Sequence, residues 1–199
     1  MKNKSGFGID LNSPVVLGMT ALSFVMFIIS RIFSGGLTML FGAYRTSFAD
    51  PMQYLRLFSH ILIHADLGHF TANFMMILAI GPMVEEKYKS GNFCLMVIIT
   101  AFVTGLINVI FFPGRAVIGA SGIVFMLILL ASFTNIRQGK IPLTVLLVAF
   151  LYIGNEIAAG LFTQDNISHL SHIAGGVCGA CFGYAFNIKT PPANNISGS

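Results

Sequence analysis

Long stretches without a charged residue constrain the fold of this chain more than any other feature. A helix crosses the hydrocarbon core of a bilayer with about 20 residues. Runs of suitable length, uncharged or nearly so, cover 11–30, 67–84, 90–114, 116–136, 141–155 (extendable to 164) and 166–188. We therefore predict an all-α membrane protein with six transmembrane helices.

The composition excludes most other classes of protein. Charged residues make up 9% of the chain, whereas an average soluble domain has roughly 25% and needs them for its surface. The net charge is only +4 and the basic residues are scattered, so nucleic acid is not an expected partner. Cys178 and Cys181 have C-x-x-C spacing, but they lie in an apolar run. We interpret them as packing residues rather than a redox dithiol.

The ends of the chain and the basic residues predict its orientation. We expect 1–10 to be a cytoplasmic N-terminus, 11–189 to be one membrane domain and 190–199 to be a disordered cytoplasmic tail. Seven Lys and Arg residues fall on the side of the termini and four on the other side, which places both termini in the cytoplasm. The short N-terminal segment has no Arg- and Ser-rich transit character. We therefore expect an integral multi-pass protein of a bacterial plasma (inner) membrane.

One predicted connection is long and apolar. The first outer loop covers about 35 residues, from about Ile32 to Asp66, and a loop of this length is uncommon unless it has a role. Aromatic residues such as Tyr44, Phe48 and Phe58 are mixed there with arginines. This pattern favours short helices that lie in the plane of the membrane interface.

Polar residues in three predicted spans fall at one depth. The second, fourth and sixth spans run in the same direction, and each is preceded by a charged residue. With a helical rise of about 1.5 Å per residue, Asn73, Ser121 and His172 each lie about 10 Å beyond that charge. His69 lies one turn before Asn73 on the same face. Such residues are costly inside a membrane, so their shared depth indicates a functional site.

The residues around Ser121 suit a nucleophile. Gly119, Ser121 and Gly122 form a Gly-x-Ser-Gly motif at a predicted helix start. The backbone N–H groups are unpaired there and the helix dipole favours negative charge, so an oxyanion would be stabilised. By itself, the motif is more typical of small residues at a helix crossing.

The sixth span offers a base for this serine. Small residues recur every fourth position in a stripe formed by Ser171, Gly175, Gly179 and Gly183, which lets another helix approach closely. If the fourth span packs there, His172 beside the stripe can reach Ser121 and act as its general base. Because no carboxylate lies at this depth, we expect a dyad rather than a triad.

The histidines leave other interpretations open. His60 and His64 are spaced i, i+4, which suits a metal, but the H-E-x-x-H pattern is absent and no further ligands are grouped with them. A haem held between His69 and His172 is a remote alternative. We expect no metal and no cofactor, and we interpret His60, His64 and His169 as structural. The halves of the chain show no repeat that would indicate a transporter.

Taken together, these motifs resemble those of rhomboid intramembrane serine proteases, from the first outer loop onward. The family pattern H-x-x-x-H-x-x-x-x-H-x-x-x-N, the Gly-x-Ser-Gly motif and the His-x-x-Gly-x-x-x-Gly motif occur in the expected order. They are formed by His60, His64, His69 and Asn73, by Gly119, Ser121 and Gly122, and by His172, Gly175 and Gly179.

The resemblance implies a fold and an activity. The fold would be a six-helix rhomboid bundle with a long in-plane first outer loop. Ser121 would be the nucleophile and His172 its base, with an oxyanion hole formed by the Ser121 N–H and the side chains of His69 and Asn73. The substrates would be single-pass transmembrane proteins that enter from the lipid, with the fifth span as a lateral gate.

The resemblance also implies supporting roles. His64 would be structural within the second span, and Phe125 would stack on the catalytic imidazole. Glu85 would be the acidic residue in the cytoplasmic turn after the second span. Arg56 would anchor the first loop, although Leu55 stands before it where the family often has Trp.

The departures from the family pattern do not remove a proposed catalytic group. The chain contains no Trp, and Ser171 precedes His172 where Ala is frequent. We therefore expect an active enzyme. The alternative is a non-catalytic rhomboid-like protein that binds membrane clients. The sequence makes no prediction of oligomeric state or of a particular substrate.

Overall fold

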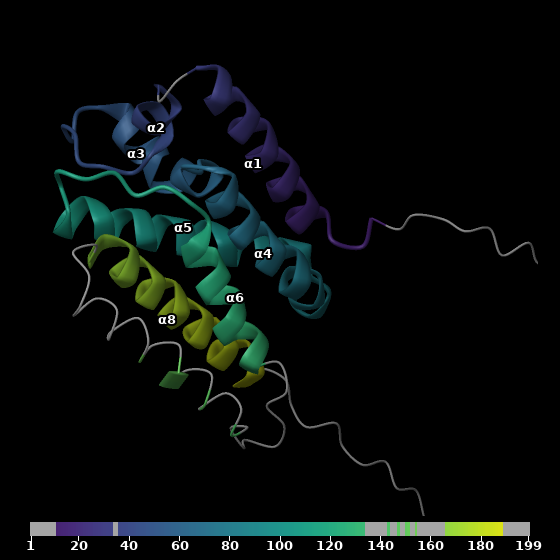
Figure 1. Ribbon diagram of the computed structural model, residues 1–199. Helices are drawn as coiled ribbons and strands as arrows, with labels where there is room; N and C mark the ends of the chain where they lie inside the picture. The colour runs from purple at the N-terminus through teal and green to yellow at the C-terminus, as the bar shows by residue number, and fades with distance from the viewer. Residues whose placement is uncertain are drawn as a thin grey trace, which may run out of the picture.

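The computed structural model describes residues 11–33, 36–133 and 166–188, together with single positions between 143 and 154. These ranges are helical apart from turns, loops and one isolated bridge between Ala43 and Val117. The elements, shown in Figure 1, are α1 (Pro14–Ile32), α2 (Gly36–Phe41), α3 (Pro51–Ser59), the 3₁₀ helix η1 (His60–Leu62), α4 (Leu67–Tyr88), α5 (Ser90–Phe111), α6 (Ser121–Phe133) and α8 (Asn166–Ile188). The predicted all-α class is confirmed.

Five of the six predicted spans contain a helix. α1, α4 and α5 are long and apolar enough to cross a membrane, and α6 is a shorter apolar helix; α8 has the bounds that the sequence predicts. The fifth predicted span, 141–155, and its proposed gate lie outside the described residues except for single positions. The count of six spans therefore remains a prediction.

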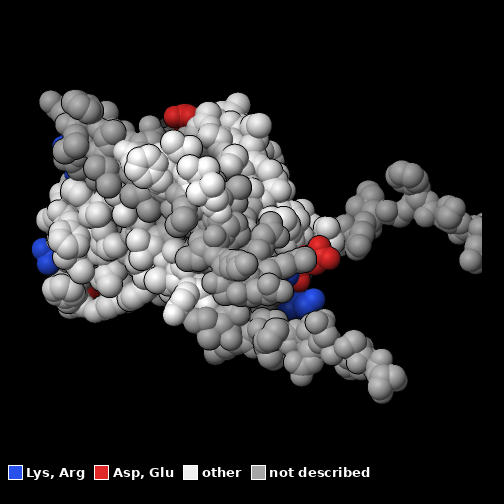
Figure 2. Space-filling model, turned by 90° about the horizontal axis from the view of Figure 1, so that it is seen from below, with Lys and Arg blue, Asp and Glu red and all other residues white. Residues whose placement is uncertain are grey.

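The outer surface of the described helices is apolar. Large hydrophobic side chains such as Phe24 of α1, Met75 of α4 and Ile98 of α5 are at least 46% exposed. On the face drawn in Figure 2, the few described Lys, Arg, Asp and Glu side chains lie at the margins. An apolar surface of this extent is typical of contact with lipid rather than water.

The start of α1 is held by the end of α4. Pro14 at the first helical position has no N–H to satisfy, and the next two N–H groups, of Val15 and Val16, each donate to one carboxylate oxygen of Glu85 at 3.0 Å. Glu85 is 1% exposed. The sequence places this residue in a turn after the second span, which is wrong: α4 continues to Tyr88, so Glu85 lies within the helix and caps a neighbouring one.

The first outer loop is folded onto α5. α2 and α3 lie together on one flank of the bundle (Figure 1), and α3 packs closely on α5 because a Cβ on Gly105 would lie 3.0 Å from Leu57 Cα. His60 follows α3, and its Nε2 lies 3.0 Å from the carbonyl oxygen of Ala101. His60 therefore anchors the loop to the bundle through α5.

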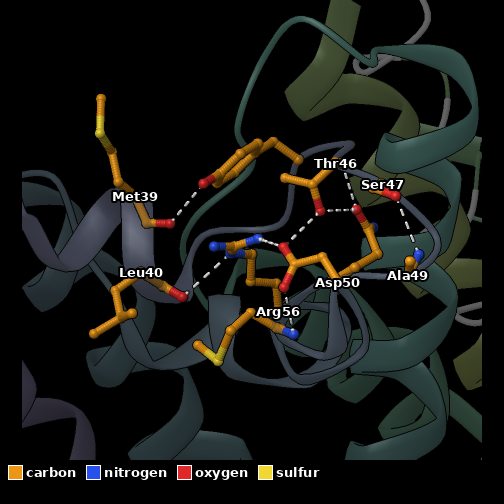
Figure 3. Close-up of polar contacts among 10 residues, drawn as sticks. Met39, Leu40, Thr46, Ser47, Ala49, Asp50 and Arg56 are labelled. Atoms are coloured by element: carbon orange, nitrogen blue, oxygen red, sulfur yellow. Dashed lines mark hydrogen bonds and ion pairs between the residues drawn. The ribbon is translucent and has the colours of Figure 1, made fainter.

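Arg56 organises the interior of this loop (Figure 3). Its Nη1 pairs with Asp50 Oδ2 at 3.1 Å, and its Nε donates to the carbonyl of Leu40 at 3.3 Å. The guanidinium lies 4.6 Å from the ring centroid of Tyr44. The pKa of the Asp50 carboxyl is lowered, mainly by the hydrogen bond that it accepts from the Met52 N–H. Arg56 is thus buried and joined to three parts of the loop.

Candidate active site

The small-residue stripe of α8 packs directly on the backbone of α6. A Cβ added to Gly175 would overlap the carbonyl oxygen of Gly122 and lie 2.8 Å from its carbonyl carbon. A Cβ on Gly179 would lie 2.9 Å from the carbonyl carbon of Met126. Because both pairs advance by four residues in the same direction, the two helices run parallel. The close approach that the stripe predicts is confirmed, and α6 is the helix that makes it.

This contact places Ser121 and His172 on adjoining turns. Ser121 is the first residue of α6 and immediately precedes Gly122, while His172 lies one turn before Gly175 on α8. The His172 ring stacks on Phe125, with centroids 4.2 Å apart and an interplanar angle of 15°. Since Phe125 lies one turn after Ser121, the stacking holds the imidazole against the face of α6 that carries the serine.

The segment before Ser121 is not helical. α5 ends at Phe111 and α6 begins only at Ser121. Between them, Val117 exchanges two backbone hydrogen bonds with Ala43 at 2.9 and 3.0 Å, and the Gly119 N–H donates to the carbonyl of His60 at 2.9 Å. The helix start predicted at Ser121 is correct, but the helical rise assumed from Arg115 does not apply, because pairing with the first loop keeps this segment out of a helix.

Gly119 brings α4 against this segment. Its φ is +109°, a value that side chains disfavour. A Cβ at this position would lie 2.5 Å from His69 Nε2 and 3.6 Å from Asn73 Nδ2. Glycine therefore leaves room for the His69 ring beside the chain two residues before Ser121, while Asn73 lies at an ordinary contact distance.

Asn73 carries an unused donor at this place. The residue is 6% exposed, and its Nδ2 has no hydrogen-bond partner among the described residues. Buried polar groups are nearly always paired, so an orphan of this kind calls for an explanation. The site lies at the first turn of α6, where the positive end of the helix dipole favours an anion. The arrangement has the chemistry of an oxyanion site beside a serine and an imidazole.

His64 supports the backbone next to the serine. Its Nε2 accepts a hydrogen bond from the Ala120 N–H at 3.3 Å, and its ring lies edge-on to that of His69 with centroids 5.1 Å apart. Burial lowers the pKa of His64, so the imidazole is neutral and can accept. The prediction that His64 lies within the second span is wrong, because Asp66 caps α4 and the helix begins at Leu67.

The metal alternative finds no support in the described ranges, where no group of three His, Cys, Asp or Glu side chains is arranged to hold an ion. His60 and His64 face different partners, the carbonyl of Ala101 and the N–H of Ala120. Each of the two histidines therefore contacts the backbone of a different segment.

A polar face of α5 was not predicted as part of the site. Thr104 contacts Gly122, since a Cβ there would lie 2.9 Å from Thr104 Cγ2. Asn108 donates to the carbonyls of Ala43 and Arg115 at 2.7 and 2.9 Å, which joins the first loop to the segment before Ser121. The sequence does contain a signal for this face, because Thr104 and Asn108 are spaced four residues apart in the third predicted span. The stripe of small residues in the sixth predicted span has the same spacing.

Comparison with known proteins shows that the chain is similar to rhomboid proteins. A model of the rhomboid domain matches residues 51–188. The rhomboid protease GluP of Bacillus subtilis (strain 168) is 27% identical over 164 residues, which cover 78% of this chain and 32% of GluP. The rhomboid protease GlpG of Serratia proteamaculans (strain 568) is 26% identical over 172 residues, 83% of this chain and 60% of GlpG. Rhomboid-related protein 2 of Mus musculus is 28% identical over 142 residues, 65% of this chain and 47% of its own length.

The chain belongs to the rhomboid family, since the domain model covers 51–188 of its 199 residues. The match and the apolar helices identify it as an integral membrane protein. The matched region spans between 32% and 60% of the length of these three relatives.

Proposed function

We propose that this protein is an intramembrane serine endopeptidase with Ser121 as nucleophile and His172 as general base. The observation that carries the proposal is the backbone contact of Gly175 with Gly122, which brings the turn of His172 against the turn of Ser121. Family membership supports it, since GluP and GlpG are both named rhomboid proteases.

The first half of the reaction follows from this arrangement. Ser121 Oγ attacks the carbonyl carbon of the scissile peptide bond while His172 accepts the hydroxyl proton. The negative charge on the carbonyl oxygen is stabilised by the Ser121 N–H and by the side chains of His69 and Asn73. His172 then protonates the leaving amine, which departs and leaves the acyl group on Ser121.

We infer that the substrates are single-pass transmembrane proteins. A peptide bond in a transmembrane helix is shielded by its own hydrogen bonds, so the helix must unwind locally before Ser121 can attack. Residues that weaken a helix lower the cost of that step. We further propose that the protein resides in a bacterial inner membrane with both termini in the cytoplasm, in keeping with the distribution of Lys and Arg.

Labelling with a fluorophosphonate probe tests the proposal. The purified protein in detergent should react with the probe, whereas Ser121→Ala and His172→Ala should not, because the first lacks the nucleophile and the second cannot activate it. Asn73→Ala should react about 10²–10³-fold more slowly, the scale for loss of one oxyanion donor. A folded wild-type protein that fails to react would contradict the proposal and favour the client-binding alternative.

A further inference from the structure

A second polar group at the site is not used by the proposed acylation step. Ser171 is 4% exposed, and its Oγ has no hydrogen-bond partner among the described residues. Three other helical hydroxyls, of Thr20, Thr104 and Ser132, each donate to a carbonyl one turn earlier at 2.7–2.9 Å, whereas Ser23 and Thr100 share the unpartnered state of Ser171. Ser171 therefore carries a buried hydroxyl that its own helix does not satisfy.

The helix register places this hydroxyl beside the reacting groups. On α8, Gly175 meets Gly122 near the start of α6. Ser171 lies one turn before Gly175, so it lies beyond the first turn of α6, on the side of the segment that leads into Ser121. Ser171 also directly precedes His172. It therefore lies next to the proposed base and close to the start of α6.

The chemistry of Ser171 differs from that of Asn73. The buried Nδ2 of Asn73 only donates, which suits an anionic oxygen. A serine hydroxyl both donates and accepts, and buried hydroxyls without a protein partner are satisfied by water. The two groups also lie on different helices, Asn73 on α4 and Ser171 on α8.

We propose that the Ser171 hydroxyl positions the water that hydrolyses the acyl-enzyme; this inference rests on the proposed function. In that step, the water oxygen bonds to the ester carbonyl carbon as His172 accepts one water proton. The bond from the carbonyl carbon to Ser121 Oγ then breaks, and His172 returns the proton to that oxygen. The products are a carboxylic acid and the free serine. Ser171 acts as a positioning residue for the second half of the reaction.

Separate measurement of the two halves tests the proposal. The rate of fluorophosphonate labelling reports attack by Ser121. For the second half, the protein is acylated with a 4-nitrophenyl ester, excess ester is removed, and the loss of the acyl group is followed by intact-protein mass spectrometry. Ser171→Ala should label at the wild-type rate but should lose the acyl group about tenfold more slowly, the scale of one hydrogen bond.

Ser23→Ala is the matched control, because Ser23 is another buried serine whose Oγ has no partner in the described part of the chain, on α1, which carries no proposed catalytic group. Both rates should be unchanged in Ser23→Ala. Wild-type loss of the acyl group in Ser171→Ala would overturn the inference, and so would equal slowing of both steps, which would indicate a structural role. A wild-type protein that does not label would instead contradict the proposed function.

Discussion

Two contacts assemble the candidate site, and they are built in different ways. α8 meets α6 through backbone, where Gly175 and Gly179 leave no room for a side chain. The first loop meets α5 at one close glycine, Gly105, but separate hydrogen bonds from side chains such as those of His60 and Asn108 join it to α5 and to the segment before Ser121. The first contact therefore tolerates no added atom, whereas the second can lose one bond and keep the others.

This difference has a physical basis. Two backbones in contact can respond to an added methyl group only if a whole helix shifts, and a shift of about 1 Å at a catalytic group can cost 10²-fold in rate. A hydrogen bond contributes about 1 kcal/mol on balance, somewhat more when its loss strands a buried partner. Substitutions at the two contacts should therefore differ in both size and kind.

The largest effect is expected for Gly175→Ala. The new Cβ would overlap the Gly122 carbonyl, so α8 must move away from α6 and take His172 with it. Nucleophile and base act as a unit, and we expect labelling by the fluorophosphonate to fall at least about 10³-fold. Gly176→Ala is the matched control, because its Cβ would meet only Leu129 at 3.7 Å. Equal labelling of the two variants would show that the backbone contact is not needed.

Gly119→Ala should have the next largest effect. The alanine would have to adopt a φ of +109° and would press on His69 Nε2, so the proposed oxyanion donors would be displaced. We expect the labelling rate to fall about 10²-fold. Gly114→Ala lies in the same connection with nothing within 4 Å of its Cβ and should label normally. If Gly119→Ala also labels normally, the proximity of His69 has no catalytic meaning.

Asn108→Ala tests the second contact. The substitution removes the two hydrogen bonds that join Ala43 and Arg115 to α5, while the Ala43 carbonyl keeps its bond from the Val117 N–H. We expect a loss of about 1–3 kcal/mol in the free energy of unfolding, seen as a lower melting temperature, with labelling reduced about tenfold. Asn92→Ala, which loses only a bond to Tyr88 at the other end of α5, should melt as the wild type does. A larger loss of labelling than in Gly119→Ala would reverse the proposed order of the contacts.

Arg56→Gln should have the smallest effect on the site. Arg56 holds the interior of the loop through Asp50 and Leu40 and does not reach the segment before Ser121. We expect a lower melting temperature with labelling within a few-fold of the wild type. Arg45→Gln changes an exposed arginine of the same loop and should alter neither measurement. Loss of labelling on the scale of Gly119→Ala would mean that the loop acts on the site directly.

Some of these features follow from the sequence alone. The positions of the helices are determined by the lengths of the uncharged runs, because the cost of burying a charge in lipid depends on composition within the run. The start of α6 at Ser121 and the close approach of α8 are likewise local, since they follow from glycine positions within each helix.

Other features were decided only by the tertiary structure. Three features join parts of the chain that are far apart in sequence. They are the non-helical segment before Ser121, the cap that Glu85 provides for α1, and the bond that the Ala120 N–H donates to His64. The sequence of a segment between two helices does not reveal whether that segment is free or paired with a distant loop. Because the free energy of each hydrogen bond depends on which partner the packed helices bring within reach, these contacts are fixed by the bundle as a whole.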